Sequence, residues 1–317
     1  MDEVFAVEGQ AKVNPEVLRS MMKKSDKAGI IQLVSHLLVL AATGLGLWLT
    51  RGSWWGVPFF VLHGMVINWL YAAQHETSHG TAFRTGWINQ WVGRFTGFVL
   101  LFPREYDRLQ HFCHHRHTQD PEKDAELVYS SFYNGPFADV LALAGITYWI
   151  GLATSVIRHA VTGKRIPASE YYLSEDQERH VVTEARWHLA LYALVVVISV
   201  MFQTWIFVIL WWAPMLATAW THQIQNYIEH GDMPFVNDTW RNTRTTDTNP
   251  AMRWLAWQMT HHTAHHTYPG VPFHRLPDLH KAIVEVRGEE PTTRTYFSYA
   301  AEVIRGSFTN KPSEAAA

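Results

Sequence analysis

Histidine is concentrated in three short clusters whose spacing suits metal binding. The sequence has 19 histidines, and the clusters follow the patterns HxxxH, HxxHH and HxxHH. Residues three and four apart share one face of a helix, so each cluster would present its imidazoles together. In chain order the clustered side chains are His75 and His79, then His111, His114 and His115, then His262, His265 and His266.

The type and number of these side chains indicate which ion they would bind. Imidazole suits borderline transition metals such as iron, zinc and copper, whereas hard cations prefer oxygen ligands. Eight neutral ligands exceed what one ion with roughly four to six ligands can use, so the pattern predicts two metal ions. The single cysteine, Cys113, excludes an intramolecular disulfide, a CxxC redox pair and a cysteine-based metal site.

A fourth segment, Asn226-Tyr-Ile-Glu-His230, could complete the site. Asn226 and His230 are four residues apart, so His230 could be a ninth ligand and Asn226 could hold a metal-bound water. Carboxylates near the clusters could orient the imidazoles by accepting their second N–H. Judged by proximity in sequence, the candidates are Glu76, Asp120, Glu229 and Asp278.

Long uncharged runs must position these clusters. Residues 28–50 and 52–75 contain no Asp, Glu, Lys or Arg. Each run is long enough to cross a hydrocarbon core, which takes about 20 helical residues, and only Arg51 separates them. A third run, 187–228, is too long for one crossing and is expected to break near Gln203. The sequence therefore predicts four transmembrane helices in two hairpins.

Two shorter apolar stretches are expected to lie in the membrane interface or to re-enter. If the clusters form one site, the chain must cross the membrane an even number of times between His115 and His261. The second hairpin already supplies two crossings, which leaves none for residues 140–157. The stretch 91–102 is interpreted in the same way.

Basic residues gather on the side of the membrane that carries the clusters. By the positive-inside rule, both termini and all three clusters are expected to face the cytoplasm. The predicted fold is thus an all-α integral membrane protein with a cytosolic helical cap. We expect a cytosolic segment over residues 1–27, a membrane and catalytic domain over 28–282, and a cytosolic tail over 283–317.

The segments HETSH, HFCHH and HHTAHH, with Asn226 and His230 between the second and third, resemble the membrane fatty acid desaturase superfamily. The resemblance covers roughly residues 55–282 and implies two irons held by nine histidines. It also implies an O2- and electron-dependent attack on an unactivated C–H bond. The segment from Asn226 to Gly231 is closer to its counterpart in membrane alkane hydroxylases. The implied iron ligands are His75, His79, His111, His114, His115, His230, His262, His265 and His266.

These observations favour a desaturase that acts on a fatty acyl or similar lipid chain. Hydroxylation of an alkyl or terpenoid substrate would use the same ligands and is the alternative. A metal transporter or a membrane haem protein is a remote alternative, because either would place its histidines inside the spans. The formal net charge of -2, without a basic block, gives no electrostatic case for binding nucleic acid.

The electrons for such a reaction must come from another protein. The sequence has no CxxC pair for a rubredoxin-like centre, no HPGG segment of a fused b-type cytochrome and no GxGxxG segment. We therefore expect no haem, flavin or NAD bound by this chain. A separate ferredoxin, rubredoxin or b-type cytochrome, supplied by a reductase, is the expected donor.

Overall fold

The computed structural model describes residues 12–127 and 135–309, and almost all of its regular structure is helical. Two three-residue strands, paired in parallel with Thr245 opposite Thr293, are its departure from the predicted all-α fold. The elements are, in chain order, α1 (Pro15–Met21), α2 (Asp26–Thr50), α3 (Gly56–Asn68), α4 (Leu70–Ser78), α5 (Gly86–Val99), α6 (Arg104–His117), α7 (Pro136–Leu143), α8 (Ile146–Thr162), α9 (Glu175–Met201), η1 (Val208–Trp212), α10 (Ala213–Ala217), α11 (Trp220–His230), α12 (Thr239–Asn242), β1 (Thr245–Asp247), α13 (Pro250–Leu255), α14 (His262–Thr267), η2 (Phe273–Arg275), α15 (Leu276–Arg287), β2 (Thr293–Thr295) and α16 (Tyr296–Thr309).

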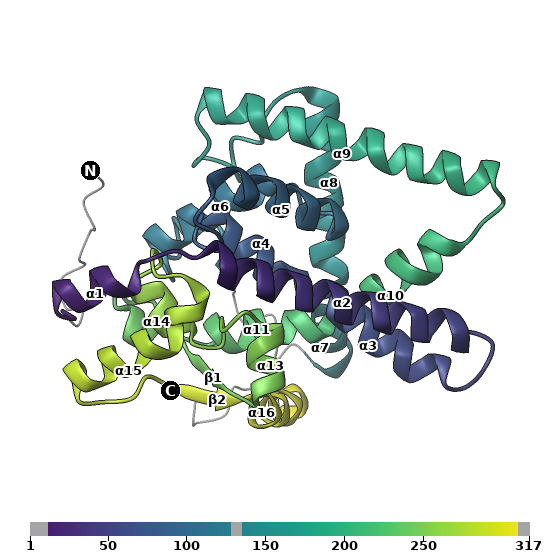
Figure 1. Cartoon of the computed structure of the whole chain (residues 1–317). Helices are drawn as coiled ribbons and strands as arrows, with labels where there is room; N and C mark the ends of the chain where they lie inside the picture. The colour runs from purple at the N-terminus through teal and green to yellow at the C-terminus, as the bar shows by residue number, and fades with distance from the viewer. Residues whose placement is uncertain (1–11, 128–134, 310–317) are drawn as a thin grey trace.

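The first predicted hairpin is formed by α2 and α3, which run back along each other (Figure 1). Ser25 caps α2, because its hydroxyl accepts a hydrogen bond from the backbone N–H of Ala28. Polar contacts bind the two helices together inside the hairpin: the Nε2 atom of His36 lies 2.9 Å from the Val66 carbonyl oxygen. After a break at Trp69, α4 continues the second arm, so Gly56–Ser78 is one candidate span.

The second predicted hairpin is confirmed only in its first arm. A capping box at Ser174 starts α9, and the helix ends before Gln203, whose φ of 49° turns the chain where the break was expected. Within the described residues three helices are long and apolar enough to cross a membrane: α2, Gly56–Ser78 and α9. Their outer faces expose large apolar side chains such as Leu38 and Val200, a surface that suits lipid contact.

The predicted fourth crossing, which should begin after Gln203, is not one continuous helix. It consists of the π-helix η1, then α10, then α11. Pro214 has no N–H to donate to the Leu210 carbonyl, and the Nε2 atom of His63 takes that place at 2.8 Å. A second break at Thr218 and Ala219 separates α10 from α11. The long apolar run after Gln203 therefore does not form the single regular helix that its hydropathy predicted.

The stretch 140–157 forms two helices. Between α7 and α8, Gly145 adopts a φ of 69°, and the pair is bent by 47°. The bend fits a re-entrant element and also fits one broken span, so the expected re-entry stays a prediction. The stretch 91–102 falls largely in α5, which is not among the candidate spans of the described chain.

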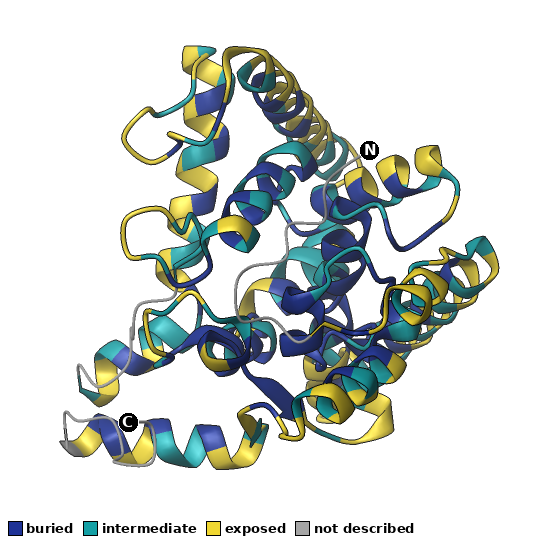
Figure 2. Ribbon diagram, turned by 90° about the vertical axis from the view of Figure 1, so that its left-hand side faces the viewer, coloured by how far each residue is buried: buried dark blue, intermediate teal, exposed yellow. Residues whose placement is uncertain are grey.

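The helices that carry histidines lie beside one another at one end of the apolar hairpins. In Figure 1, the α2–α3 hairpin and the far end of α9 extend away from the side that holds α14 and α15. Figure 2 shows the buried residues gathered at the centre of the molecule and the exposed residues around its edge. One buried apolar cluster includes Ala72, Ala264, Trp257 and Leu276, and it packs α4, α14 and α15 together beside the histidines.

Candidate metal centre

Nine histidines from four helices converge on one buried region. α4 and its C-cap supply His75 and His79, and α11 supplies His230 at its last position. Each HxxHH triplet lies on one helix, the first on α6 and the second on α14, as the spacing predicted. The nine side chains are those expected from the sequence: His75, His79, His111, His114, His115, His230, His262, His265 and His266.

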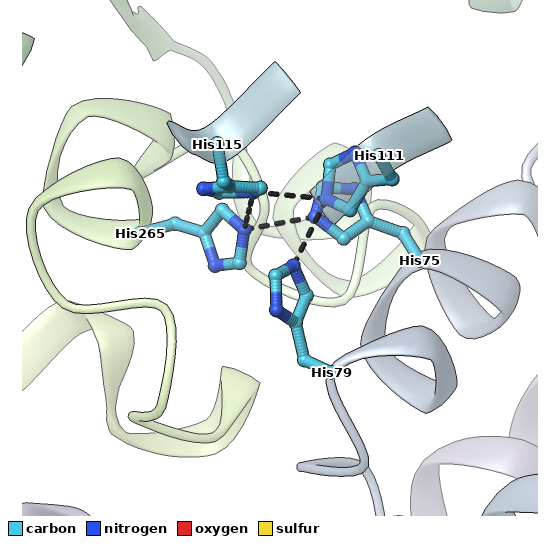
Figure 3. Close-up of side chains that lie close together, drawn as sticks. All are labelled: His75, His79, His111, His115 and His265. Carbon is cyan, nitrogen blue, oxygen red and sulfur yellow. Dashed lines mark hydrogen bonds between the residues drawn. The ribbon is translucent and has the colours of Figure 1, made fainter. Parts of the chain in front are cut away.

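Five of these histidines form a first group, shown in Figure 3. It consists of His75, His79, His111, His115 and His265, whose potential ligand atoms all lie within 4.8 Å of one another. The Nε2 atoms of His75 and His265 are 2.8 Å apart, and those of His79 and His111 are 2.9 Å apart. The Nε2 atom of His115 lies 2.9 Å from that of His111.

A second group lies beside the first and consists of His114, His230 and His266, again with ligand atoms within 4.8 Å of one another. The Nε2 atoms of His114 and His230 are 3.2 Å apart. His262 adjoins this group, since its Nε2 atom lies 2.7 Å from that of His230. The groups share elements, because α6 and α14 each contribute to both.

The arrangement fits metal ions better than hydrogen bonding among the rings. The Nε2 atom of His111 faces both His79 and His115, yet one ring nitrogen offers either one proton or one lone pair. The Nε2 atom of His266 is buried without a hydrogen-bond partner in the described chain. Two imidazoles bound at right angles to one ion, each at about 2.1 Å, would have nitrogens about 3 Å apart. That separation matches those observed.

The lowered pKa of most of these imidazoles leaves each ring with an unprotonated nitrogen that can bind a metal. Burial, followed by repulsion from neighbouring imidazoles, holds the pKa of His111, His115 and His265 well below the ordinary value of 6.5. These rings are therefore neutral at pH 7 and able to bind a metal. For His114 burial also lowers the pKa, but the Asp124 carboxylate outweighs it and the net shift is upward.

Of the four carboxylates predicted to orient the imidazoles, only Glu229 lies against one of the nine rings. Its Oε1 atom is 3.3 Å from the Nδ1 atom of His262. The other three were misplaced by sequence proximity. Glu76 follows His75 on α4 and so points to a different face of the helix. Its carboxylate accepts hydrogen bonds from the Thr81 hydroxyl and from the backbone N–H of Phe273. Asp120 accepts from the backbone of its own turn, and Asp278 pairs with Arg275 on the surface.

Two carboxylates that the sequence reasoning missed take this place. The Oδ1 atom of Asp124 lies 2.8 Å from the Nδ1 atom of His114, and the Oε2 atom of Glu126 lies 3.3 Å from that of His111. Burial raises the pKa of Glu126 to about 7. Both residues belong to the acidic segment that directly follows the second histidine cluster, which was the signal available in the sequence.

A cavity of about 460 Å³ adjoins the two histidine groups. Its wall includes five of the nine histidines, and Asn226 lies on the same wall, one turn before His230. A volume of this size is within the usual range for a small-molecule site. A substrate that fills the cavity would reach the histidines.

Comparison with known proteins agrees with this geometry. A family model described as fatty acid desaturase matches residues 52–298. An sn-1 oleoyl-lipid 12-desaturase from Anabaena variabilis is 23% identical over 80% of this chain and 63% of its own length. One of the same description from a Picosynechococcus species is 24% identical over 80% of this chain and 76% of its own length. An sn-1 acyl-lipid omega-3 desaturase (ferredoxin) from a Synechocystis species is 29% identical over 23% of this chain and 20% of its own length. The chain thus spans less than two thirds of the Anabaena relative.

Proposed function

Because this chain belongs to the fatty acid desaturase family, we propose that it is a membrane di-iron oxidoreductase that introduces a double bond into a fatty acyl or similar lipid chain. The convergence of nine histidines in two groups beside one cavity is the observation that carries the proposal. The names of the oleoyl-lipid and acyl-lipid relatives support a lipid substrate.

We propose that the two groups each hold one iron ion. The first group, His75, His79, His111, His115 and His265, would hold one. His114, His230, His262 and His266 would hold the other, with Asn226 reaching it through a water. Bound iron would supply the oxidising chemistry toward an unactivated C–H bond, with O2 as co-substrate.

The protein's own groups would fix the rings in the form that binds metal. When Asp124 accepts the Nδ1–H of His114, the proton is held on Nδ1 and the Nε2 lone pair faces the centre. Glu126 would do the same for His111. Glu229 lies 3.3 Å from the Nδ1 atom of His262 but makes no hydrogen bond to it in this arrangement. Burial of the nine rings would keep bulk water from the reacting carbon, and the cavity would position that carbon against them.

The proposed topology has four membrane crossings and a cytosolic cap, with both termini and the metal centre on the cytoplasmic side. Residues 28–282 would form the membrane and catalytic unit, and residues 1–27 and 283–317 would flank it in the cytosol. Residues 1–11 and 310–317 lie outside the described residues. Three helices of the described chain that are long and apolar enough to cross a membrane support the membrane location.

An external protein would supply the electrons: a ferredoxin, a rubredoxin or a b-type cytochrome, reduced in turn by a reductase. The printed name of the Synechocystis relative includes ferredoxin, which favours that donor. The grouping of the histidines beside one another, at the end of the candidate spans, argues against a metal transporter or a haem protein.

Hydroxylation of an alkyl or terpenoid chain is the second candidate. The segment from Asn226 to Gly231, with its likeness to alkane hydroxylases, favours it, and Asn226 lies on the cavity wall. Both reactions begin with removal of hydrogen from the same carbon, so the ligands alone do not separate them.

Mass spectrometry of lipids from a host that expresses the protein tests the proposal. Loss of two hydrogens from a lipid chain would support desaturation, and gain of one oxygen would support hydroxylation. His265→Ala is the inactive comparison, and His180→Ala, on the exposed face of α9, is the matched control. If the iron-loaded wild type leaves the lipids unchanged when a reduced donor and O2 are supplied, the proposal fails.

A further inference from the structure

One wall of the cavity carries polar side chains that are not among the proposed metal ligands. His222 and Gln223 lie on α11 and line the cavity. Their backbone N–H groups both donate to the Ala219 carbonyl, but neither side chain makes a hydrogen bond to any described residue. Gln223 is only 7% exposed, and both residues also line a smaller adjoining cavity of about 20 Å³. The polar atoms of both side chains are open to the cavity and are not sealed in the protein, so they offer unused hydrogen-bonding groups to whatever fills it.

The surroundings hold these two side chains in place. The ring of His222 packs edge-on against Tyr71, with ring centroids 4.6 Å apart, and against Trp69 at 5.9 Å. Gln223 lies over the backbone of Gly145, where an added Cβ would meet its side chain at 3.5 Å. By contrast, two other glutamines of the cavity wall are already bonded: Gln110 donates to the Ala125 carbonyl, and Gln225 contacts Glu229 and Tyr296.

The position of this pair relative to the metal centre is set by the helix. His222, Asn226 and His230 recur every four residues and so share one face of α11. At a rise of 1.5 Å per residue, His222 lies about 12 Å along the axis from His230. A group bound at His222 and Gln223 would therefore lie beyond the direct reach of the ions, with the rest of the molecule extending toward them.

The charges of the cavity decide which polar group fits. Among the described lining residues there is no lysine or arginine, whereas two carboxyl groups, Glu126 and Glu229, are present. A bound carboxylate or phosphate would lose its hydration without gaining a cation. A carbonyl or hydroxyl oxygen can pair with an amide and an imidazole at no such cost.

We infer that His222 and Gln223 bind a neutral oxygen-bearing group of the substrate, so that the substrate is an oxygen-functionalised lipid, such as an ester or an alcohol, and not a plain hydrocarbon or a free fatty acid. This inference rests on the proposed function for the identity of the site. It adds a substrate class and two specificity-determining residues.

Equilibrium binding tests the inference without turnover. The full-length, iron-loaded protein in detergent is kept without O2 or donor, and tritiated myristyl alcohol is displaced by methyl myristate, tetradecane or myristate. The expected result is that the alcohol and the ester bind about tenfold tighter than tetradecane and myristate. His222→Phe keeps the aromatic packing and Gln223→Leu keeps the volume. Each should weaken the alcohol and the ester about five- to tenfold and leave tetradecane unchanged.

Controls separate binding from folding. His180→Phe and Gln90→Leu make the same chemical changes at exposed positions on α9 and α5 and should change nothing. His222→Gln keeps a polar side chain and should retain most of the affinity. If a variant does not fold, as judged by iron content and thermal unfolding, the wild-type ranking of the four ligands still decides.

Three results would overturn the inference: tetradecane binding as tightly as the alcohol, myristate binding tightest, or both variants weakening all four ligands equally. The proposed function is judged separately by product formation. Oxidised product with tetradecane ranked equal would refute only the inference, whereas the predicted ranking without any product would refute only the proposed reaction.

Discussion

Replacing Asp124 with asparagine should weaken metal binding while leaving the fold in place. The carboxylate is buried and accepts three hydrogen bonds: Oδ1 from His114 at 2.8 Å and from the Glu126 backbone at 2.9 Å, and Oδ2 from the Gln119 backbone at 2.8 Å. An asparagine has one acceptor oxygen, so its NH2 group must face either the ring or the backbone donor. A buried donor left unpaired costs about 1–3 kcal/mol.

The substitution would remove the hydrogen bond that orients His114, so its Nε2 lone pair would no longer be held toward the proposed metal ion. Loss of a hydrogen bond that orients a ligand typically lowers metal affinity about 10- to 100-fold, or roughly 1.4–2.7 kcal/mol. Competition with a chromophoric chelator for Fe²⁺, or for Co²⁺ as a probe, measures the change. We expect Asp124→Asn to lose about one order of magnitude or more.

Asp120→Asn is the matched control. Asp120 lies four residues earlier in the same segment, accepts from the backbone N–H of Glu122 and pairs with Lys123, and contacts none of the nine rings. It should keep wild-type affinity. Equal affinities of wild type and Asp124→Asn, or equal losses in both variants, would refute the role given to Asp124.

Three further predictions concern the role of Glu229, the packing around Gly64 and the pH dependence of stability. Glu229→Gln should lower metal affinity less than Asp124→Asn in the same competition assay, because Glu229 lies 3.3 Å from His262 without a hydrogen bond to it, whereas Asp124 accepts from His114 at 2.8 Å; a larger loss would contradict this. Gly64→Ala should lower stability by about 1–3 kcal/mol in thermal unfolding, since the new Cβ would meet the Pro214 carbonyl oxygen at 2.3 Å, whereas Gly52→Ala has open space and should be neutral. After removal of metal, the free energy of unfolding should fall as the pH is lowered below about 6.5, by up to roughly 1.4 kcal/mol per histidine and pH unit. The reason is that unfolded imidazoles take up protons that the buried rings, with their lowered pKa, do not. Thermal unfolding would show this as a lower transition temperature, and a flat profile between about pH 7.5 and 5.5 would refute the assignment.

The grouping of the histidines was largely predictable because the information within each cluster is local. Spacings of three and four residues place imidazoles on one helix face whatever surrounds the helix, and α6 and α14 show this directly. The convergence of four helices is not local. The crossing count assumed that the clusters form one site, and the number and direction of the crossings stay predictions. The position of His230 at the end of α11 was suggested by its spacing of four residues from Asn226.

The parts that were predicted wrongly depend on contacts between segments. Hydropathy did not record that Pro214 lacks an N–H, or that the chain turns again at Thr218, so the fourth crossing was drawn as one helix. Proximity in sequence chose Glu76, which points to a different helix face from His75. Asp124 reaches His114 only because the loop after α6 folds back along the helix, which no spacing rule states.

Metal analysis of the purified protein, combined with its optical spectrum, shows whether the nine histidines hold two irons. We expect two irons per chain without a Soret band, and loss of iron in both His114→Ala and His265→Ala, which remove one ligand from each group. A single iron per folded chain after full reconstitution, a Soret band, or full iron content in both variants would contradict this expectation.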